Sequence, residues 1–140
     1  MKGNECVNLL EQHGIRVTAN RIVVLKALAA ARQPLSLAEL VDEVGTIDKS
    51  GVFRTLTTFH ARHLVHVIEG GSDSTKWELC RSRDERHDDD AHAHFYCTRC
   101  HRTMCLDSIG LPRVTLPAGF EQHSANYVIS GLCPRCSAKQ

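Results

Sequence analysis

Two Cys-x-x-Cys motifs constrain the fold of this chain more than any other feature of its sequence. The first, CTRC, contributes Cys97 and Cys100, and the second, CPRC, contributes Cys133 and Cys136. Each such turn places two sulfurs on one side, and two turns together give the tetrahedral four-sulfur set that Zn²⁺ favours. Because this set leaves no coordination position open, we predict a structural zinc whose binding energy helps to fold a small β unit. A redox dithiol and iron–sulfur ligation are the alternatives.

Length and composition set the broad class of the protein. The 140 residues suit one medium domain or two small ones, and the odd count of seven cysteines favours metal sites over disulfides in a reducing compartment. No apolar run is long enough for a signal peptide or a membrane span, so we expect a cytoplasmic protein without a membrane partner. The 17 Lys and Arg nearly balance the 16 Asp and Glu. Nucleic-acid binding must therefore be argued from local cations.

Residues 1–81 have the pattern of a winged helix-turn-helix domain. Apolar residues at helical spacing predict four helices: one over residues 4–13, one between Thr18 and Pro34, one over residues 37–44, and one that begins at Asp48 or Ser50. Ser36 and Glu39 have the spacing of a capping box before the third helix. Two β-rich runs come next, LVHVIEGG and STKWELC, on either side of a turn at Gly70-Gly71. They predict a β-hairpin.

The composition changes after the predicted hairpin. Residues 82–90 are charged throughout and have no apolar stripe, so we interpret them as a hinge linker. Residues 91–140 alternate in the manner of strands around the Pro- and Gly-rich segment IGLPRVTLPAG. The predicted fold class is therefore α+β, with a winged helix followed by a small α/β unit that zinc holds together.

A second metal site is indicated by His92, His94 and Cys80. Residues two apart in a strand face the same way, so both imidazoles point to one side, whereas Cys97 lies an odd number of positions away. A metal that joins the histidines to Cys80 would clamp the two domains across the linker and act as a switch. Mixed nitrogen and sulfur ligands favour Zn²⁺ over Mn²⁺. Alternatively, the histidines are ordinary surface residues, and Cys80 and Cys105 are small buried hydrophobic residues.

Several motifs, taken in chain order, resemble the ferric uptake regulator family of bacterial metalloregulators. They are GIRVTANRIVVLKAL, the recognition-helix segment SGVFRTLTTFHARHLV, and then KWELC, HAHFYCTRC and GLCPRC. The resemblance covers nearly the whole chain. It implies a homodimeric repressor with an N-terminal winged helix and a C-terminal dimerisation domain, which binds A/T-rich inverted repeats when it is loaded with metal. The segment 106–119 departs from the family, because it is too short and Pro-rich for the usual long dimerisation helix.

The same resemblance implies which residues contact double-stranded DNA. Arg54 matches an arginine expected at the phosphate backbone, and Ser50 belongs to the same signature. Phe53 stands where a tyrosine usually contacts a base, and its ring can still meet a thymine methyl group. Arg16 matches a residue that reaches the minor groove, and Arg21 matches an arginine of the second helix. For Arg16 and Arg21 a plain surface role is the alternative.

For the sensor metal, the zinc uptake regulators of this family give the best match. Cys80, His92 and His94 match ligand positions of that branch. His66 falls where a fourth ligand often sits, whereas Cys105 replaces a glutamate that ligates metal in some members. The fourth ligand is therefore either His66 or Cys105. We expect two zinc ions per subunit, one structural and one regulatory.

These features predict a zinc-responsive transcriptional repressor that acts as a homodimer, takes no small-molecule substrate and is not an enzyme. A regulator of the same family that senses iron, manganese or peroxide is the main alternative. A thiol redox protein is a further alternative. It is disfavoured because neither CTRC nor CPRC is expected to open a helix in a βαβ pattern, where a thiolate would gain from the helix dipole.

Overall fold

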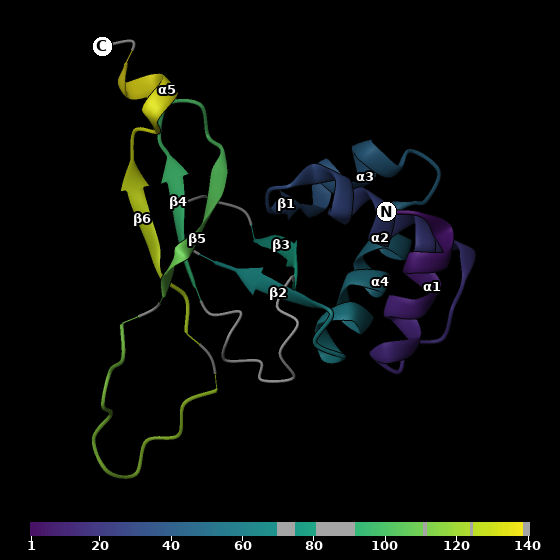
Figure 1. Cartoon of the computed structure of the whole chain (residues 1–140), viewed down its shortest axis with the longest axis horizontal. Coiled ribbons are helices and arrows are strands. Elements are labelled where there is room, and N and C mark those ends of the chain that lie inside the picture. The colour runs from purple at the N-terminus through teal and green to yellow at the C-terminus, as the bar shows by residue number, and fades with distance from the viewer. Residues whose placement is uncertain (70–74, 81–91, 111, 124, 139–140) are drawn as a thin grey trace. The chain divides into compact units, whose positions relative to one another are not determined.

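The computed structural model describes residues 1–69, 75–80, 92–110, 112–123 and 125–138. These residues belong to two compact units (Figure 1). Of the described residues, unit 1 contains 1–68 and 75–80, and unit 2 contains Glu69 and those from 92 onwards. The predicted linker 82–90 and the turn at Gly70-Gly71 lie outside the described residues.

Four helices open unit 1 where the apolar spacing predicts them. They are α1 (Gly3–Gln12), α2 (Ala19–Ala31), α3 (Leu37–Val44) and α4 (Lys49–Ala61). Thr18 begins α2, because its hydroxyl accepts a hydrogen bond from the backbone N–H of Arg21 at 3.2 Å. Asp48, and not Ser50, caps α4, because its carboxylate accepts from the backbone N–H of Gly51 at 3.0 Å.

The predicted capping box of α3 is confirmed. The Ser36 hydroxyl accepts from the backbone N–H of Glu39 at 3.2 Å, and the Glu39 carboxylate accepts from the backbone N–H of Ser36 at 2.9 Å. Gly45 ends the helix in the left-handed conformation, with φ of 71°. Local sequence therefore sets both ends of this helix.

A small antiparallel sheet completes unit 1. Its strands β1 (Leu35–Ser36), β2 (Val65–Ile68) and β3 (Lys76–Leu79) lie in the order β1-β3-β2. The predicted hairpin corresponds to β2 and β3. Strand β1 is not predicted, because two residues carry no periodic signal. Four helices and this sheet confirm the winged helix-turn-helix outline of the first domain.

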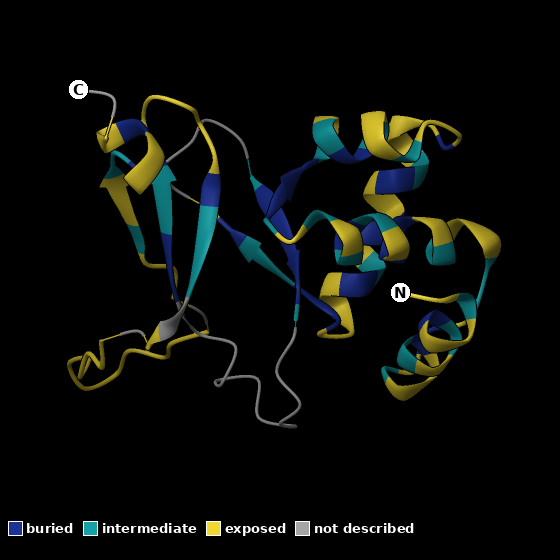
Figure 2. Ribbon diagram, turned by 45° about the horizontal axis from the view of Figure 1, so that its top comes forward, coloured by how far each residue is buried: buried dark blue, intermediate teal, exposed yellow. Residues whose placement is uncertain are grey.

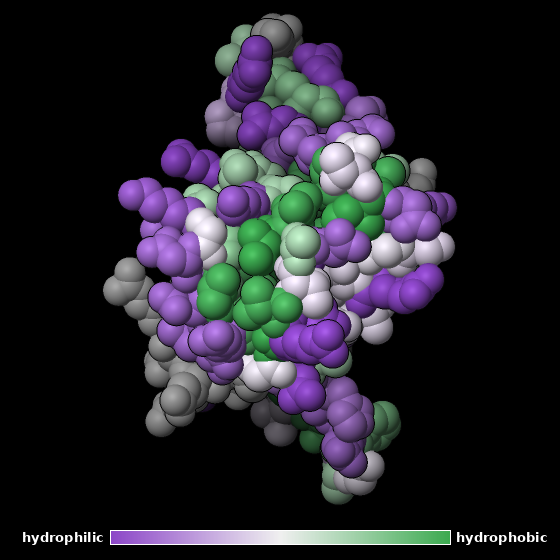
Figure 3. Space-filling model, turned by 90° about the vertical axis from the view of Figure 1, so that its right-hand side faces the viewer, coloured by the Kyte–Doolittle hydropathy of each residue, from purple (hydrophilic) through white to green (hydrophobic). Residues whose placement is uncertain are grey.

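The core of unit 1 lies where the helices meet one another and the sheet (Figure 2). Its most deeply buried side chains include Leu10, Val24, Leu25, Leu40, Val52, Leu56, Phe59 and Leu64. In α2 and α4 the buried residues recur at helical spacing and form one apolar stripe on each helix, and Leu64 follows α4. On the face shown in Figure 3, hydrophobic side chains gather at the centre and hydrophilic ones surround them.

Unit 2 is built around a second three-stranded sheet. Strands β4 (His92–Cys97), β5 (Thr103–Gly110) and β6 (Val128–Gly131) lie in the order β5-β4-β6. The central strand β4 pairs antiparallel with β5 and parallel with β6. The buried cluster of this unit consists of Cys97, Cys133 and Cys136, with Phe95, Met104 and Leu132 packed against it. Cysteine thus fills the place that aliphatic residues occupy in unit 1.

Two features of unit 2 bear on the sequence analysis. CPRC opens a short helix, α5 (Pro134–Ser137), with Cys133 at its N-cap. No strand follows α5 in the described residues, so this helix does not belong to a βαβ pattern. Proline at the first helical position explains the start, because its fixed φ suits a helix and it lacks only an N–H that would have no partner there. Residues 112–123 and 125–127 form no helix or strand, consistent with the expected absence of a long helix there.

Candidate metal centres and nucleic-acid surface

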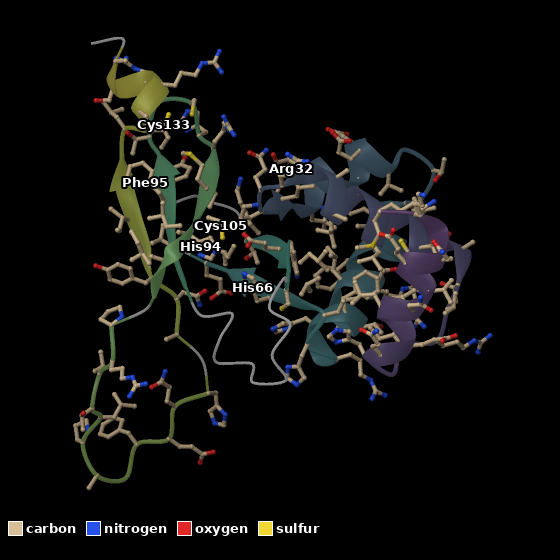
Figure 4. The ribbon with its side chains drawn as sticks, in the orientation of Figure 1. Arg32, His66, His94, Phe95, Cys105 and Cys133 are labelled. Atoms are coloured by element: carbon tan, nitrogen blue, oxygen red, sulfur yellow. The ribbon has the colours of Figure 1, made fainter. Side chains whose placement is uncertain are left out.

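Four cysteine sulfurs converge at one end of unit 2 (Figure 4). Cys97 ends β4, Cys100 lies in the turn that follows, and Cys133 and Cys136 belong to the start of α5. All four Sγ atoms lie within 4.8 Å of one another. The Cys100 and Cys133 sulfurs are 3.9 Å apart, far longer than a disulfide bond. The structure therefore brings together the four residues predicted to hold the structural zinc.

The spacing of these sulfurs fits a tetrahedral zinc site. Zn–S bonds of about 2.3 Å place neighbouring sulfurs of a tetrahedron roughly 3.8 Å apart. The observed 3.9 Å between Cys100 and Cys133 is close to this value. Zinc bound here would have four thiolate ligands and no open position, so its chemistry would be structural.

The surroundings of two of these thiols, Cys97 and Cys136, shift their pKa values in opposite directions. Backbone N–H groups of Cys100 and Cys133 donate to Cys97 Sγ at 3.5 Å each and lower the pKa of that thiol to about 5. Burial, with hydrogen bonds from the neighbouring thiols, raises the pKa of Cys136 to about 12. Thiolates this close repel one another, so ionisation of Cys97 disfavours ionisation of Cys136. A divalent cation removes the repulsion and lets all four ionise, with release of protons.

A second group of side chains able to ligate a metal lies on the wing of unit 1, which strands β2 and β3 form. His66 Nδ1 in β2 is 3.5 Å from Cys80 Sγ, at the end of β3. His66 Nε2 is 3.7 Å from a carboxylate oxygen of Glu78, whose side chain is only 8% exposed. His66 and Glu78 are direct cross-strand partners, and Cys80 follows two residues later on the same face. Nitrogen, oxygen and sulfur donors therefore share one face of the wing.

Unit 2 carries its own pair of candidate ligands. His94 on β4 is directly opposite Cys105 on β5, so both side chains lie on the same face of the sheet (Figure 4). His94 is buried and Cys105 is half-buried. His92 lies in β4 two residues earlier, and its side chain lies outside the described residues.

Glu78 is the candidate ligand that sequence reasoning missed. Its neighbours Trp77 and Leu79 face the core, so Glu78 points to the same side as Cys80. The strand alternation in KWELC carried this signal: a carboxylate two residues before a proposed cysteine ligand lies on the ligand face.

The exposed stripe of α4 carries three of the residues predicted to contact DNA, Ser50, Phe53 and Arg54, together with Thr57. Ser50, Phe53, Arg54 and Thr57 are all exposed, and their spacing places them on one side of the helix. The opposite side carries the buried residues Val52, Leu56 and Phe59. A surface hollow lies beside this stripe, lined by Arg21, Phe53, Arg54, Thr55, Thr57 and Thr58.

The two arginines near the start of α2 have different roles in the structure. Arg21 Nη1 donates a hydrogen bond of 2.7 Å to the backbone carbonyl of Arg16. Arg21 thus holds the segment before α2 in place and also lines the hollow, whereas the side chain of Arg16 is exposed.

Within the part of the chain that the structure describes, no helix is long and apolar enough to cross a membrane.

A winged helix with cationic side chains along its recognition helix, joined to a unit with a four-cysteine centre, defines a metal-binding regulator. The family model described as the ferric uptake regulator family matches residues 12–114. The chain belongs to this family. Its members are metal-responsive transcription regulators and not enzymes.

Solved structures of this family have the same fold. A zinc uptake regulator complexed with zinc and DNA aligns with a TM-score of 0.72 and 20% identity, over 97% of this chain and 93% of that one. The ferric uptake regulator of Helicobacter pylori aligns at 0.64 and 14% identity, over 98% and 95%. That of Pseudomonas aeruginosa with manganese aligns at 0.60 and 23%, over 96% and 99%. A comparison with curated protein sequences gave no match.

Proposed function

We propose that this chain is a zinc-responsive transcriptional repressor that acts in the cytoplasm as a homodimer on A/T-rich inverted-repeat operators. In this proposal each subunit binds two zinc ions. The four-cysteine centre holds the structural ion. The regulatory ion takes its ligands from Cys80, His92 and His94, with His66 or Cys105 as the fourth.

The observation that carries the zinc assignment is the contact between His66 and Cys80. An imidazole nitrogen and a thiol sulfur at 3.5 Å are a ready pair of ligands for a borderline-soft cation. His94 opposite Cys105 repeats the same combination in unit 2. Mixed nitrogen and sulfur donors favour Zn²⁺ over Mn²⁺, which prefers carboxylate and water ligands.

One observation favours the second candidate, a sensor of iron or manganese. The buried carboxylate of Glu78 faces His66 at 3.7 Å and offers a hard oxygen donor. If Glu78 and the histidines bound the ion without Cys80, the donor set would contain only nitrogen and oxygen, which suits Fe²⁺ or Mn²⁺. The choice of metal therefore depends on whether the Cys80 sulfur binds it.

Exposed apolar side chains of unit 2 support the dimer. Val114 and Phe120 are each 68% exposed, and Ile109, Leu116, Tyr127 and Ile129 are also exposed. A soluble chain rarely leaves so many large apolar residues in one small unit open to water. A second copy of unit 2 would cover them without the long helix that other family members use.

Metal content measured beside operator binding tests the proposal. We expect about two zinc ions per chain, of which a mild chelator removes one and abolishes operator binding with it. Operator binding that persists after chelation would leave a constitutive DNA-binding protein. Tighter binding of Fe²⁺ or Mn²⁺ than Zn²⁺ at the exchangeable site would select the second candidate.

Replacement of His92 and His94 together by alanine separates the two sites. We expect the variant to lose metal-dependent repression but to keep the other zinc and its fold, because the four cysteines remain. His123→Ala is the matched control, since that imidazole lies on the exposed segment of the same unit. Unfolding of the double variant would contradict the separation. Single variants His66→Ala and Cys105→Ser identify the fourth ligand, because only its loss weakens binding of the exchangeable zinc.

A further inference from the structure

The ring of Phe53 contacts the ring of Trp77 in unit 1. Their centroids are 6.5 Å apart and the ring planes meet at 87°, an edge-to-face arrangement that aromatic pairs favour. Phe53 comes from the exposed stripe of α4 and is 49% exposed, whereas Trp77 in β3 is only 9% exposed. One ring is therefore fixed in the core and the other reaches into solvent.

The surroundings of Trp77 hold its ring in place. Trp77 lies in the central strand of the sheet, paired with Leu35 of β1 and Val67 of β2. It also belongs to the buried core that the helices form. The wing strand and the recognition helix, which are distant in the sequence, thus meet at this ring contact.

We infer that Trp77 is a positioning residue for base recognition by Phe53, an inference that rests on the proposed DNA-binding function. Phe53 interrupts an otherwise polar stripe, between Ser50, Arg54 and Thr57. An apolar ring at this place suits a thymine methyl group and cannot donate or accept a hydrogen bond. A free Phe ring would have to be ordered when DNA binds, whereas the contact with Trp77 orders it beforehand.

The size of the effect follows from the cost of ordering one side chain at an interface. That cost corresponds to roughly a 2- to 10-fold change in affinity. Loss of the Trp77 ring should therefore weaken operator binding by this factor. It should leave binding to unrelated DNA unchanged, because phosphate contacts supply nearly all of that affinity.

The test uses an A/T-rich duplex selected from a random pool by the zinc-loaded wild-type chain. Each thymine of this duplex is replaced in turn by uracil, which lacks only the methyl group. Positions whose replacement weakens the wild type but not Phe53→Leu are those that Phe53 contacts. We expect Trp77→Leu to lose this methyl dependence. Trp77→Phe, which keeps an aromatic ring at this position, should retain part of it.

Two controls separate the ring contact from general damage to the core. Leu79→Ala removes a buried side chain from the same face of β3 and should keep the methyl dependence. In the Phe53→Leu background, Trp77→Leu should have no further effect on operator affinity, because the two residues act as one. Should Trp77→Leu fail to fold, proton NMR of the wild type provides the readout: cross-peaks between the two rings should be present in both the free and the operator-bound protein.

The outcomes distinguish this inference from the proposed function. No operator binding by the zinc-loaded wild type would overturn the proposed function. Operator binding in which Trp77→Leu keeps the full methyl dependence would overturn the role of Trp77 alone. The role of Trp77 would also be overturned if the wild type bound the operator without any thymine whose methyl group depends on Phe53. Loss of the ring cross-peaks in the DNA complex would overturn it too.

Discussion

Gly51, in the first turn of α4, occupies a position with no room for a methyl group. A Cβ atom built there would lie 2.7 Å from Ile47 Cγ2 and 2.8 Å from the Asp48 carboxylate. Ile47 is buried and Asp48 accepts the hydrogen bond that caps the helix, so neither can move without cost. Glycine, ordinarily a poor helix residue, is required here by its neighbours.

We therefore expect Gly51→Ala to destabilise unit 1 by about 1 kcal/mol, through overpacking at Ile47 and a weaker Asp48 cap. Urea denaturation followed by the fluorescence of Trp77, the single tryptophan of the chain, measures the change. Gly3→Ala in the first turn of α1 is the matched control, because nothing lies within 4 Å of a Cβ there. It should leave stability unchanged or raise it. A stabilised Gly51→Ala variant would contradict the steric argument.

Arg54 provides a second prediction for a single residue. Its guanidinium lies exposed on α4 beside the surface hollow, where it can neutralise one DNA phosphate. Arg54→Ala should weaken binding to all DNA sequences and reduce the slope of log K against log salt by about 1. Lys26→Ala, an exposed cation of α2, serves as the control. A slope that stays unchanged in Arg54→Ala would place this residue away from the phosphates.

Among elements, α3 shows how one capping residue links pH to stability. Partial burial would raise the pKa of Glu39, but hydrogen bonds from Ser36 and the ammonium of Lys76, 3.3 Å away, outweigh it. The pKa of this carboxyl therefore lies below its ordinary value of 4.5. A lowered carboxyl pKa stabilises the fold above the unfolded-state pKa, and this contribution is lost as the pH falls below about 4.5.

Glu39→Ala should lower the free energy of unfolding by about 1 kcal/mol at pH 7, because the capping box is lost. The difference from the wild type should shrink as the pH falls from 5 to about 3. Urea denaturation followed by Trp77 fluorescence measures this in unit 1, so loss of zinc from unit 2 in acid does not obscure it. Glu43→Ala, exposed on the same helix, should show neither effect. A difference that persists at pH 3 would show that the charge of Glu39 contributes nothing.

At the scale of the whole molecule, the two units depend on different forces. Unit 1 has a continuous aliphatic and aromatic core, whereas the buried cluster of unit 2 consists mainly of cysteines. A β unit this small cannot bury enough apolar surface to fold alone. Zinc at the four cysteines should therefore supply much of the folding free energy of unit 2.

Cys133→Ser should unfold unit 2 and leave the helices of unit 1 intact, because only unit 2 is built on the four cysteines. Circular dichroism and NMR would follow the two units, with helical signal and Trp77 retained and the β4 and β5 resonances lost. Cys105→Ser is the matched control for folding in the same unit, since all four ligands of the structural zinc remain. A folded unit 2 in Cys133→Ser would show that zinc is not needed there.

Local chemistry allowed the helices of unit 1, the caps at Thr18 and Ser36, and the four-cysteine set to be predicted from sequence. Each of these features depends on residues at a fixed spacing, and the geometry of a single turn or helix determines how those residues are placed. Strand β1 and helix α5 were beyond such reasoning. Two residues carry no periodicity, and the single turn of α5 forms beside sulfurs that come from another strand.

The sequence by itself determined the family, the two Cys-x-x-Cys units and the apolar stripe of each helix, because these are patterns among near neighbours in the chain. Only the tertiary structure decided that Glu78 faces His66, that Arg21 holds Arg16, and that Trp77 meets Phe53. The contacts of Glu78 with His66 and of Trp77 with Phe53 join segments whose mutual placement depends on strand register and packing, which local spacing does not give. The Arg21–Arg16 contact is local, but it depends on the path of the backbone before α2, which residue spacing does not give either.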